Sequence, residues 1–508
     1  MGILRAISTM RLSEVIERAA GRSDAGGDPE VSLLADDSRQ VRPGAVFFAF
    51  RGTRADGHDF AAAAARSGAV AVVAERQVPC APARLILVPD ARRALALAAA
   101  RFHGNPGEAL QLAGVTGTNG KTTVAWLVEA CLREAGVPAG LLGTVAYRWP
   151  GAQQPAPYTT PGAVELHALL DRMRRAGARA AVLEVSSHAL DQERVAGLPF
   201  HAAGFTNLTR DHLDYHRDLE SYFQAKRRLF VENLIPGGVA VLNADDAFGA
   251  RLAGELASGR RASAWRYGIR ERGEIGAEGL RVGLSGIEVE VLSPAGRLEV
   301  RSPLVGGHNA ENLLCAAGMA LALGLEPAAV ARGLSLCRGA PGRLERVEAG
   351  GVTAFVDYAH TDDALARVMA ALRDLSPRRL VVVFGCGGDR DRGKRPLMGE
   401  AVGRAADLAV VTSDNPRGED PLSIIGEIVP GLERSGARRV TAAAAEAGER
   451  GYAVVPDRRE AIGLALAAAR PGDAVLIAGK GHEDYQIVGA ERRHFDDREE
   501  ARRALGIA

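Results

Sequence analysis

Residues 114–123 read GVTGTNGKTT and lie between a short apolar run, 112–115, and a segment with helical periodicity. A strand, a glycine-rich loop and a helix in this order can bind phosphate, because backbone N–H groups at the helix N-terminus converge on phosphate oxygens. Lys121 can reach the β- and γ-phosphates of a nucleotide, and the Thr122 hydroxyl can bind Mg²⁺. The stretch therefore predicts a nucleoside triphosphate site in an α/β sheet.

The loop departs from the strict Walker spacing, which requires glycine where this chain has Val115. Gly114 and Gly117 stand on either side of that position. An ordinary tight turn before a helix is the alternative, but strand, loop and helix follow one another in register. The predicted helix has one apolar face, formed by Val124, Leu127, Val128, Cys131 and Leu132.

Strand-like apolar runs alternate with helical segments along most of the chain, which is typical of a mostly parallel, doubly wound sheet. Central runs lie at 112–115, 180–185, 202–205 and 239–243. Earlier runs lie at 46–50, 69–74 and 85–88, with a helical segment at 59–67, and later runs at 353–357, 380–384, 408–412 and 474–478. Residues 103–106 (HGNP) are predicted to form a linker, and the Pro/Gln-rich stretch 150–157 a surface loop.

We therefore predict an α/β fold of three domains. They are an N-terminal α/β domain at 1–108, a central P-loop domain with a mostly parallel sheet at 109–340, and a C-terminal Rossmann-like α/β domain at 341–508.

Bulk composition limits the classes of partner. The 508 residues are 47% hydrophobic and 25% charged with a formal net charge of +1, so electrostatics favour neither a nucleic acid nor a membrane partner. Five scattered cysteines without a CxxC pair argue against a disulfide framework and a structural zinc site. The N-terminus lacks a signal-peptide layout, and no apolar run approaches the roughly 20 residues of a membrane span. We expect a cytoplasmic protein without membrane insertion.

Three further residues are candidates for the chemistry. Glu184, in VLEVSSH (182–188), ends a predicted buried strand, where a Mg²⁺-binding carboxylate belongs; a capping glutamate is the alternative. His212, in TNLTRDHLDYH (206–216), is a candidate second metal ligand, although a lone histidine is more often structural. Lys226 lies in a predicted helix, where a solvated surface lysine is the ordinary interpretation.

Together these motifs resemble the Mur ligase family, whose members add amino acids to the peptidoglycan precursor. The resemblance covers about residues 30–500 and implies a UDP-substrate domain, a central ATPase and a C-terminal domain that closes over the site. The matching stretches are 117–122 (GTNGKT), 184–188 (EVSSH), 206–216 (TNLTRDHLDYH), 308–312 (HNAEN), 342–345 (GRLE) and 357–361 (DYAHT).

By this resemblance Lys226 occupies the position of a carbamylated lysine that helps to hold Mg²⁺. A carbamate turns a cation into an anionic oxygen ligand, which two Mg²⁺ ions crowded by phosphates need. The implied metal ligands are Thr122, Glu184, His212 and Lys226, and the implied catalytic residues are Lys121, Glu184, His212 and Lys226.

The resemblance also implies the contacts to ATP. His308, Asn309 and Asn312 are similar to adenine- and ribose-side contacts, and Arg343 and Asp357 to contacts from the third domain. The remaining nucleotide contacts lie on the loop: Gly117, Thr118, Asn119, Gly120, Lys121, Thr122 and Thr123. The family usually has proline where this chain has Asp362.

The stretch 414–417 (DNPR) resembles the motif of family members that add meso-diaminopimelate to UDP-N-acetylmuramoyl-L-alanyl-D-glutamate. Diaminopimelate differs from lysine by a second carboxylate, with which the Arg417 guanidinium can pair bidentately. A plain β-turn with Asx chemistry is the alternative. The implied amino-acid pocket consists of Arg390, Asp414, Asn415, Pro416, Arg417, Gly479 and Glu483, with Glu483 facing an ammonium group.

Contacts to the UDP substrate are implied in two domains. Glycine-rich turns with N–H donors suit its pyrophosphate. The N-terminal contacts are Ser38, Thr53, Arg54 and Ala55, and the central ones are Thr159, Thr160, Ser186, Gln192 and Arg194.

The predicted reaction is ATP-dependent activation of the D-glutamyl γ-carboxylate as an acyl phosphate, which the diaminopimelate amine then attacks. Three alternatives stay open. A lysine-adding ligase would have no carboxylate for Arg417 to pair with. Folylpolyglutamate synthase shares the ATPase core but should lack the DNPR motif and the N-terminal domain. A nucleotide switch that hydrolyses ATP without ligation would not need the arginine pair of the third domain.

Overall fold

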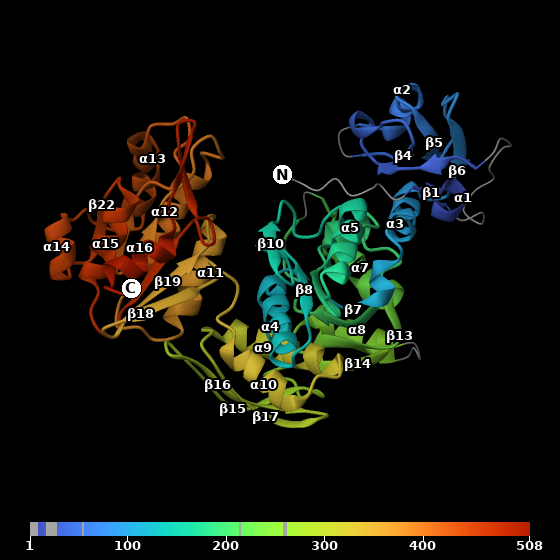
Figure 1. Ribbon diagram of the computed structural model, residues 1–508. Helices are drawn as coiled ribbons and strands as arrows, with labels where there is room; N and C mark the ends of the chain where they lie inside the picture. Colours follow the sequence, from blue (N-terminus) through green and yellow to red (C-terminus); the bar gives the residue numbers. More distant parts are fainter. Residues whose placement is uncertain (1–8, 17–27, 53–54, 213–214, 258–261, 508) are drawn as a thin grey trace. The chain divides into compact units, whose positions relative to one another are not determined.

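The computed structural model describes residues 9–16, 28–52, 55–212, 215–257 and 262–507 (Figure 1). Contacts divide the chain into two compact units. The first consists of Met1–Gly276, Ser293–Gly296 and Leu314–Gly333, and the second of Ala277–Leu292, Arg297–Leu313 and Leu334–Ala508. Each of the three predicted α/β domains has a sheet of its own, of four, eight and six strands, which confirms the fold class.

The N-terminal sheet has four parallel strands in the order β3-β4-β5-β6. They are β3 (Leu33–Ala35), β4 (Ala45–Ala49), β5 (Ala69–Ala74) and β6 (Arg84–Leu87), flanked by β1 (Met10–Arg11), α1 (Leu12–Val15), β2 (Glu30–Val31) and α3 (Ala91–Phe102). Along β4, Phe48 packs into one core and Phe47 into another, as expected for a strand covered on both faces. The predicted helix at 59–67 is a 3₁₀ turn, η3 (Gly57–Phe60), continued by α2 (Ala61–Arg66).

The central sheet has eight strands in the order β10-β9-β8-β11-β7-β12-β13-β14. Its bounds are β7 (Gln111–Thr116), β8 (Ala139–Leu142), β9 (Ala146–Trp149), β10 (Ala152–Pro155), β11 (Ala180–Glu184), β12 (Phe200–Phe205), β13 (Leu234–Asn243) and β14 (Ser263–Tyr267). Its helical segments are η4 (Pro106–Ala109), α4 (Lys121–Glu134), α5 (Ala163–Arg175), α6 (Ser187–Asp191), α7 (Leu219–Arg228), the π-turn η5 (Leu229–Asn233) and α8 (Ala247–Ala257). The six neighbouring strands β8, β11, β7, β12, β13 and β14 are parallel to one another.

The prediction of a loop at 150–157 is wrong. Strands β9 and β10 form an antiparallel hairpin, with Ala152 opposite Trp149 and Pro155 opposite Ala146. Among the strands of the described residues, β10 pairs with β9 alone. Such an edge strand tolerates proline and polar residues because only one of its backbone edges must pair with another strand.

The variant phosphate loop follows from the length of β7. Val115 is buried and belongs to this central strand, where its partners are Glu184 of β11 and Gly204 of β12. The loop turns only at Gly117, whose φ is +146°. A Cβ atom on Gly117 would lie 1.8 Å from Thr206 Oγ1, so glycine is required there and not at position 115.

The C-terminal sheet has six strands in the order β18-β19-β23-β20-β21-β22, parallel except for β18. They are β18 (Glu345–Ala349), β19 (Val352–Asp357), β20 (Leu380–Phe384), β21 (Leu408–Val411), β22 (Gly451–Val454) and β23 (Ala474–Ala478). Around them lie α11 (Asp362–Arg373), α12 (Lys394–Ala405), α13 (Pro421–Arg434), α14 (Ala442–Ala447), α15 (Arg458–Ala468), α16 (Asp497–Ala504) and the hairpin of β24 (Tyr485–Val488) and β25 (Glu491–His494). Side chains of β20 alternate between two cores, so both faces of this sheet are buried.

A further sheet lies outside every predicted run. Its strands are β15 (Gly276–Gly283), β16 (Gly286–Ser293) and β17 (Gly296–Ser302), followed by α9 (Gly307–Ala322) and α10 (Pro327–Leu336). Among the helices of the described residues, none is long and apolar enough to cross a membrane.

Candidate functional site

The phosphate loop lies between the end of β7 and the start of α4, at the carboxyl edge of the central sheet. Residues after β12 hold its shape. The Asn207 carbonyl accepts a hydrogen bond from the Thr118 N–H at 2.8 Å. The side-chain Oδ1 of Asn207 accepts one from the Asn119 N–H at 3.0 Å. Lys121 folds back over the loop, with its Nζ 2.9 Å from the carbonyl oxygens of both Gly117 and Thr118. This is the position from which a lysine can turn towards nucleotide phosphates.

Glu184 ends β11 directly beside the loop. The Thr122 hydroxyl donates a hydrogen bond to Glu184 Oε2 at 2.8 Å, and Thr144 donates to the same carboxylate through its N–H at 2.8 Å and its hydroxyl at 3.0 Å. Glu184 is only 1% exposed. A glutamate that merely caps a strand would not meet the loop threonine, so this contact favours the metal-ligand interpretation.

The donor set suits a Mg²⁺ ion that keeps phosphate ligands. Among the residues that the structure describes, no group of three His, Cys, Asp or Glu side chains could hold a metal by itself. Mg²⁺ at phosphate sites is usually bound by one or two carboxylates together with substrate oxygens. The adjacent oxygens of Thr122 and Glu184 meet this requirement.

Lys226 is 1% exposed, so the solvated-lysine interpretation is wrong. Its Nζ donates to the Gly117 carbonyl at 2.7 Å and lies 4.3 Å from the centre of the Tyr222 ring. Burial, together with the nearby charge of Lys121, lowers the pKa of Lys226 well below its ordinary value. The helix α7 thus brings a second amine to the phosphate loop, from a position that the local sequence pattern did not reveal.

His212 lies on the segment between β12 and α7 and has a φ of +54°. Its side chain is 47% exposed, and its ring meets His188 edge-on, with 5.0 Å between the ring centres. The ring is also 6.1 Å from that of Tyr222, the aromatic residue beneath Lys226. His212 and Lys226 therefore contact the same tyrosine.

The five central residues predicted to contact the UDP substrate form one connected network. The Thr160 hydroxyl donates to the Glu184 carbonyl at 2.7 Å and accepts from the Ser186 N–H at 3.0 Å. Arg194 donates to the Thr160 carbonyl at 2.8 Å and to Gln192 Oε1 at 2.7 Å. Thr159 joins the network because its hydroxyl lies 3.1 Å from that of Thr144. The network is therefore bonded to Glu184, the predicted metal ligand at the end of β11.

The N-terminal contacts are placed less completely. Ser38 begins the 3₁₀ turn η2 (Ser38–Gln40), which Asp37 caps by accepting the Arg39 N–H at 2.9 Å. Ala55 is exposed and accepts the Gly52 N–H on its carbonyl at 2.9 Å. Thr53 and Arg54 lie outside the described residues.

The predicted nucleotide contacts of the second unit fall into two groups. Asp357, at the end of β19, accepts the N–H groups of Leu344 and Ala359 at 2.8 Å each. Burial raises its pKa, against the opposing charge of Arg343. At the start of α9, Asn312 donates to Asn309 Oδ1 at 2.9 Å and Asn309 donates to the Val305 carbonyl at 2.8 Å; His308, beside them, is exposed. The two asparagines thus also hold the start of their own helix.

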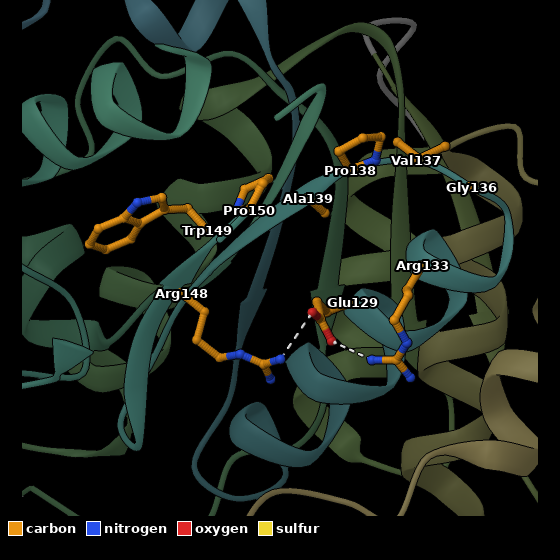
Figure 2. A pocket seen from close by; sticks show the side chains of 9 residues that line it. All are labelled: Glu129, Arg133, Gly136, Val137, Pro138, Ala139, Arg148, Trp149 and Pro150. Carbon is orange, nitrogen blue, oxygen red and sulfur yellow. Dashed lines mark hydrogen bonds and ion pairs between the residues drawn. The ribbon is translucent and has the colours of Figure 1, made fainter. Parts of the chain in front are cut away.

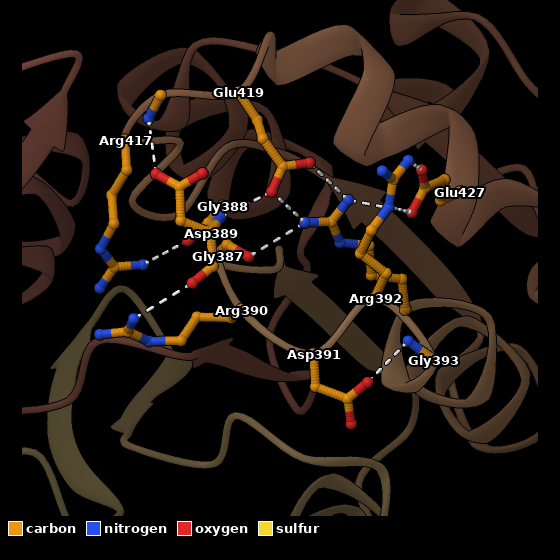
Figure 3. A network of polar contacts seen from close by, with 12 residues as sticks. Gly387, Gly388, Asp389, Arg390, Asp391, Arg392, Gly393, Arg417, Glu419 and Glu427 are labelled. Carbon is orange, nitrogen blue, oxygen red and sulfur yellow. Dashed lines mark hydrogen bonds and ion pairs between the residues drawn. The ribbon is translucent and has the colours of Figure 1, made fainter.

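The predicted amino-acid pocket is assembled by loops that follow β20, β21 and β23. Asn415 donates to Glu483 Oε2 at 2.9 Å. Figure 3 shows the neighbouring contact, in which Arg417 Nη1 donates to the Gly388 carbonyl at 2.8 Å. Gly479 has a φ of +117°, and a Cβ atom there would lie 2.6 Å from the carboxylate of Asp414. Pro416 is buried, whereas Arg390, on the neighbouring loop, is exposed. These residues are far apart in sequence and lie together at one edge of the sheet.

Sequence reasoning missed several side chains of these sites. Lys480 is fully buried and donates to Glu483 Oε2 at 3.1 Å and to Asn415 Oδ1 at 3.3 Å. The only local signal for Lys480 is its position next to Gly479 and three residues before Glu483, both predicted pocket residues. Thr144 and Tyr222 carry no motif, and only their contacts with Glu184 and Lys226 reveal them.

A pocket of about 430 Å³ lies elsewhere on the central domain (Figure 2). Glu129 stands between Arg133 and Arg148, at 3.4 and 3.5 Å. Pro138 and Ala139 line this pocket, so it lies at the amino end of β8, whereas the phosphate loop lies at the carboxyl edge of the sheet. None of the predicted site residues that the structure describes lines this pocket.

Fold and site define a three-domain α/β protein with a phosphate-binding loop on its central sheet. Family models match three stretches of the chain: "Mur ligase family, catalytic domain" at residues 30–103, "Mur ligase middle domain" at 115–320, and "Mur ligase, glutamate ligase domain" at 342–481. The chain belongs to the Mur ligase family.

Curated relatives match over nearly the full length. Proteins named UDP-N-acetylmuramoyl-L-alanyl-D-glutamate--2,6-diaminopimelate ligase are 48% identical in Geobacter metallireducens, over 98% of each chain, and 46% identical in Thermosynechococcus vestitus, again over 98% of each. A solved structure of an enzyme of that name has a TM-score of 0.73 and 34% identity, and the match covers 98% of this chain and 99% of the other. A UDP-N-acetylmuramoylalanyl-D-glutamyl-2,6-diaminopimelate--D-alanyl-D-alanyl ligase of Acinetobacter baumannii, at 19% identity and a TM-score of 0.59, shares the fold; that match covers 94% of this chain and 97% of the other.

Proposed function

We propose that the chain is an ATP-dependent ligase that adds meso-2,6-diaminopimelate to UDP-N-acetylmuramoyl-L-alanyl-D-glutamate, a step of peptidoglycan precursor synthesis in the cytoplasm. The domains that serve this function are a UDP-substrate-binding domain at 1–108, an ATP-binding domain at 109–340 and an amino-acid-binding domain at 341–508.

The Arg417 guanidinium carries the choice of amino acid. Nη1 is bound to the Gly388 carbonyl, and among the described residues none forms a hydrogen bond with Nε or Nη2. Nε and Nη2 therefore stay available on a half-buried side chain whose Nη1 is held by Gly388. A guanidinium presented in this way suits a carboxylate, and the second carboxylate distinguishes diaminopimelate from lysine.

The partners of Glu483 bear on the other end of the amino acid. Asn415 and Lys480 both donate to its Oε2, which fixes the carboxylate in the pocket. A fixed carboxylate is the chemical complement of the ammonium group of an amino acid.

The central network supports a role for the D-glutamyl end of the nucleotide substrate. Arg194 and Gln192 are bonded to each other and, through Thr160, to the end of β11. Burial lowers the pKa of Arg194, and a nearby carboxylate would offset the cost of keeping the cation there.

The reaction has two steps. The γ-carboxylate of the D-glutamyl group attacks the γ-phosphorus of ATP, the bond to ADP breaks, and an acyl phosphate forms. The unprotonated amine of diaminopimelate then attacks the acyl carbon, phosphate leaves, and the amine loses a proton as the amide forms. Lys121 stabilises the negative charge that develops on the transferred phosphoryl group.

The residues that would hold Mg²⁺ are Thr122 and Glu184, with His212 and a carbamylated Lys226 for a second ion. Bound Mg²⁺ would neutralise phosphate charge and orient the γ-phosphoryl group. The lowered pKa of Lys226 favours the neutral amine, which is the form that reacts with carbon dioxide.

One assay tests the proposal. The protein is incubated with ATP, Mg²⁺ and UDP-N-acetylmuramoyl-L-alanyl-D-glutamate, and either meso-diaminopimelate or lysine is added. We expect ADP, phosphate and a tripeptide product with diaminopimelate. Phosphate release without a tripeptide product would contradict the ligase function. Equal use of lysine would contradict the proposed role of Arg417.

A further inference from the structure

Two loops of the second unit carry the arginines of the predicted amino-acid pocket (Figure 3). Arg390 follows β20 and Arg417 follows β21. The loops are joined directly, because Gly388 donates its N–H to the Asn415 carbonyl at 2.9 Å and accepts Arg417 Nη1 on its own carbonyl at 2.8 Å. The position of Arg417 thus depends on the loop that bears Arg390.

Both loops contain a residue in the left-handed region that is not glycine. Asp389 has a φ of +54° and Arg417 a φ of +51°. Such conformations cost about 1–3 kcal/mol each and persist only when surrounding contacts hold them. The strained residues are next to, or are themselves, the arginines expected to contact substrate.

Asp389 is held from two sides by the opposite loop. Its Oδ2 accepts the Gly418 N–H at 3.0 Å, and its own N–H donates to Glu419 Oε1 at 2.6 Å. Glu419 is therefore the side chain through which the second loop fixes the backbone of the first.

Glu419 is in turn fixed by a buried arginine. Arg395, whose side chain is 0% exposed, donates to the two carboxylate oxygens of Glu419 at 2.7 and 2.9 Å. The same guanidinium donates to Glu427 Oε2 at 2.9 Å. The hydrogen bonds from Arg395, and that from the Asp389 N–H, lower the pKa of Glu419 to about 2, so this carboxylate is ionised at every working pH.

We propose that Glu419, clamped by Arg395, is a positioning residue that sets the arrangement of Arg390 and Arg417 and thereby the preference for diaminopimelate over lysine. This inference rests on the proposed function. Glu419 acts through the Asp389 backbone and needs no contact with substrate. Binding groups must be held within a fraction of an ångström of productive geometry, so a loosened loop loses discrimination before it loses the fold.

Arg395 offers a matched pair of variants, because only one of its two glutamate partners, Glu419, is bonded to Asp389. Glu419→Ala removes the acceptor of the Asp389 N–H. Glu427→Ala removes the other partner of the same guanidinium, together with its ion pair to Arg392, and leaves the contacts of Asp389 with Gly418 and Glu419 in place. We expect Glu419→Ala to raise the KM for diaminopimelate about 10- to 100-fold and to lower the diaminopimelate-to-lysine ratio of kcat/KM, while the KM for ATP stays unchanged.

The controls separate positioning from stability. Glu427→Ala should leave the diaminopimelate KM and the ratio at wild-type values, whatever it does to the melting temperature. Glu419→Gln, which keeps an acceptor oxygen for Asp389, should restore most of the preference. The Glu419 side chain is 23% exposed, so its truncation to alanine does not create a closed cavity.

An unchanged KM and preference in Glu419→Ala, or equal changes in the Glu419 and Glu427 variants, would overturn the inference. A wild-type chain that formed no product with diaminopimelate would instead overturn the proposed function, and the inference with it. The wild-type reaction therefore distinguishes the two failures.

Discussion

The Nζ of Lys226 donates a hydrogen bond to the Gly117 carbonyl at 2.7 Å, and Lys121 Nζ donates to the same oxygen at 2.9 Å. One carbonyl of the phosphate loop therefore receives two amines, one from the loop's own helix and one from α7. Burial, and then the positive charge of Lys121 so close by, lower the pKa of Lys226, because both disfavour its charged form.

Lys226→Ala should lower kcat by about 100-fold or more, because it removes the buried side chain that binds the phosphate loop and, as a carbamate, would supply an anionic oxygen ligand to Mg²⁺. If the working form of Lys226 is a carbamate, short carboxylic acids such as acetate should restore part of the activity. Steady-state rates with and without added acid measure both effects. Arg227→Ala, at the next position of α7, is the control and should behave as wild type. Absence of rescue would argue against the carbamate and leave the role of the amine intact.

Arg417→Ala should raise the KM for diaminopimelate far more than the KM for ATP. A hydrogen-bonded charge pair contributes about 1.5–3 kcal/mol, which corresponds to about a 10- to 100-fold change. Arg417→Lys keeps the charge but loses the planar fork, so it should fall between alanine and wild type. Arg404→Ala, on the exposed side of α12, is the control. An unchanged diaminopimelate KM in Arg417→Ala would remove this residue from the pocket.

Gly117→Ala should abolish nucleotide binding while the protein stays folded. A Cβ atom there would lie 1.8 Å from Thr206 Oγ1, so either the loop or the strand end must move. Gly136→Ala is the matched control, since Gly136 also has a positive φ, of +69°, but has open space around its Cβ position. The control should cost about 1–2 kcal/mol of stability and leave binding intact. Titration with a non-hydrolysable ATP analogue and thermal melts distinguish the outcomes, and tight binding by Gly117→Ala would contradict the loop geometry.

His167 should make the fold acid-sensitive. Both of its ring nitrogens are buried without a hydrogen-bond partner among the described residues, and burial lowers its pKa from 6.5 to about 3. Because the unfolded chain binds a proton at a higher pH than the folded one, stability falls as the pH drops below about 6.5. Between pH 7.5 and pH 5 this residue should account for a loss of about 2 kcal/mol.

Urea unfolding of His167→Leu across that range measures the contribution, and its pH slope should be flatter than that of the wild type. His494→Leu is the control with the opposite sign, because the partner Glu499 raises the pKa of the exposed His494 and makes its protonation favour the fold. An identical slope in wild type and His167→Leu would show that His167 titrates normally in the folded state.

Local patterns were sufficient for most of the fold. The runs at 180–185 and 380–384 became β11 and β20, because a strand buried on both faces is a short block of apolar residues. The strands β16 and β17 were missed because charged residues interrupt their apolar ones. β10 was missed because its Pro/Gln composition is that of a loop and only its pairing with β9 makes it a strand.

The phosphate loop can be predicted from the sequence alone, because its strand, glycines, lysine and helix are consecutive and their geometry is local. The family can also be predicted from the sequence, through motifs that each occupy a few residues. The folded structure was needed to show that Val115 belongs to a strand, that Lys226 is buried against Gly117, and that Glu419 holds Asp389. Those relationships join residues from 30 to more than 100 positions apart, and no local pattern encodes which distant side chains a fold brings within hydrogen-bonding distance.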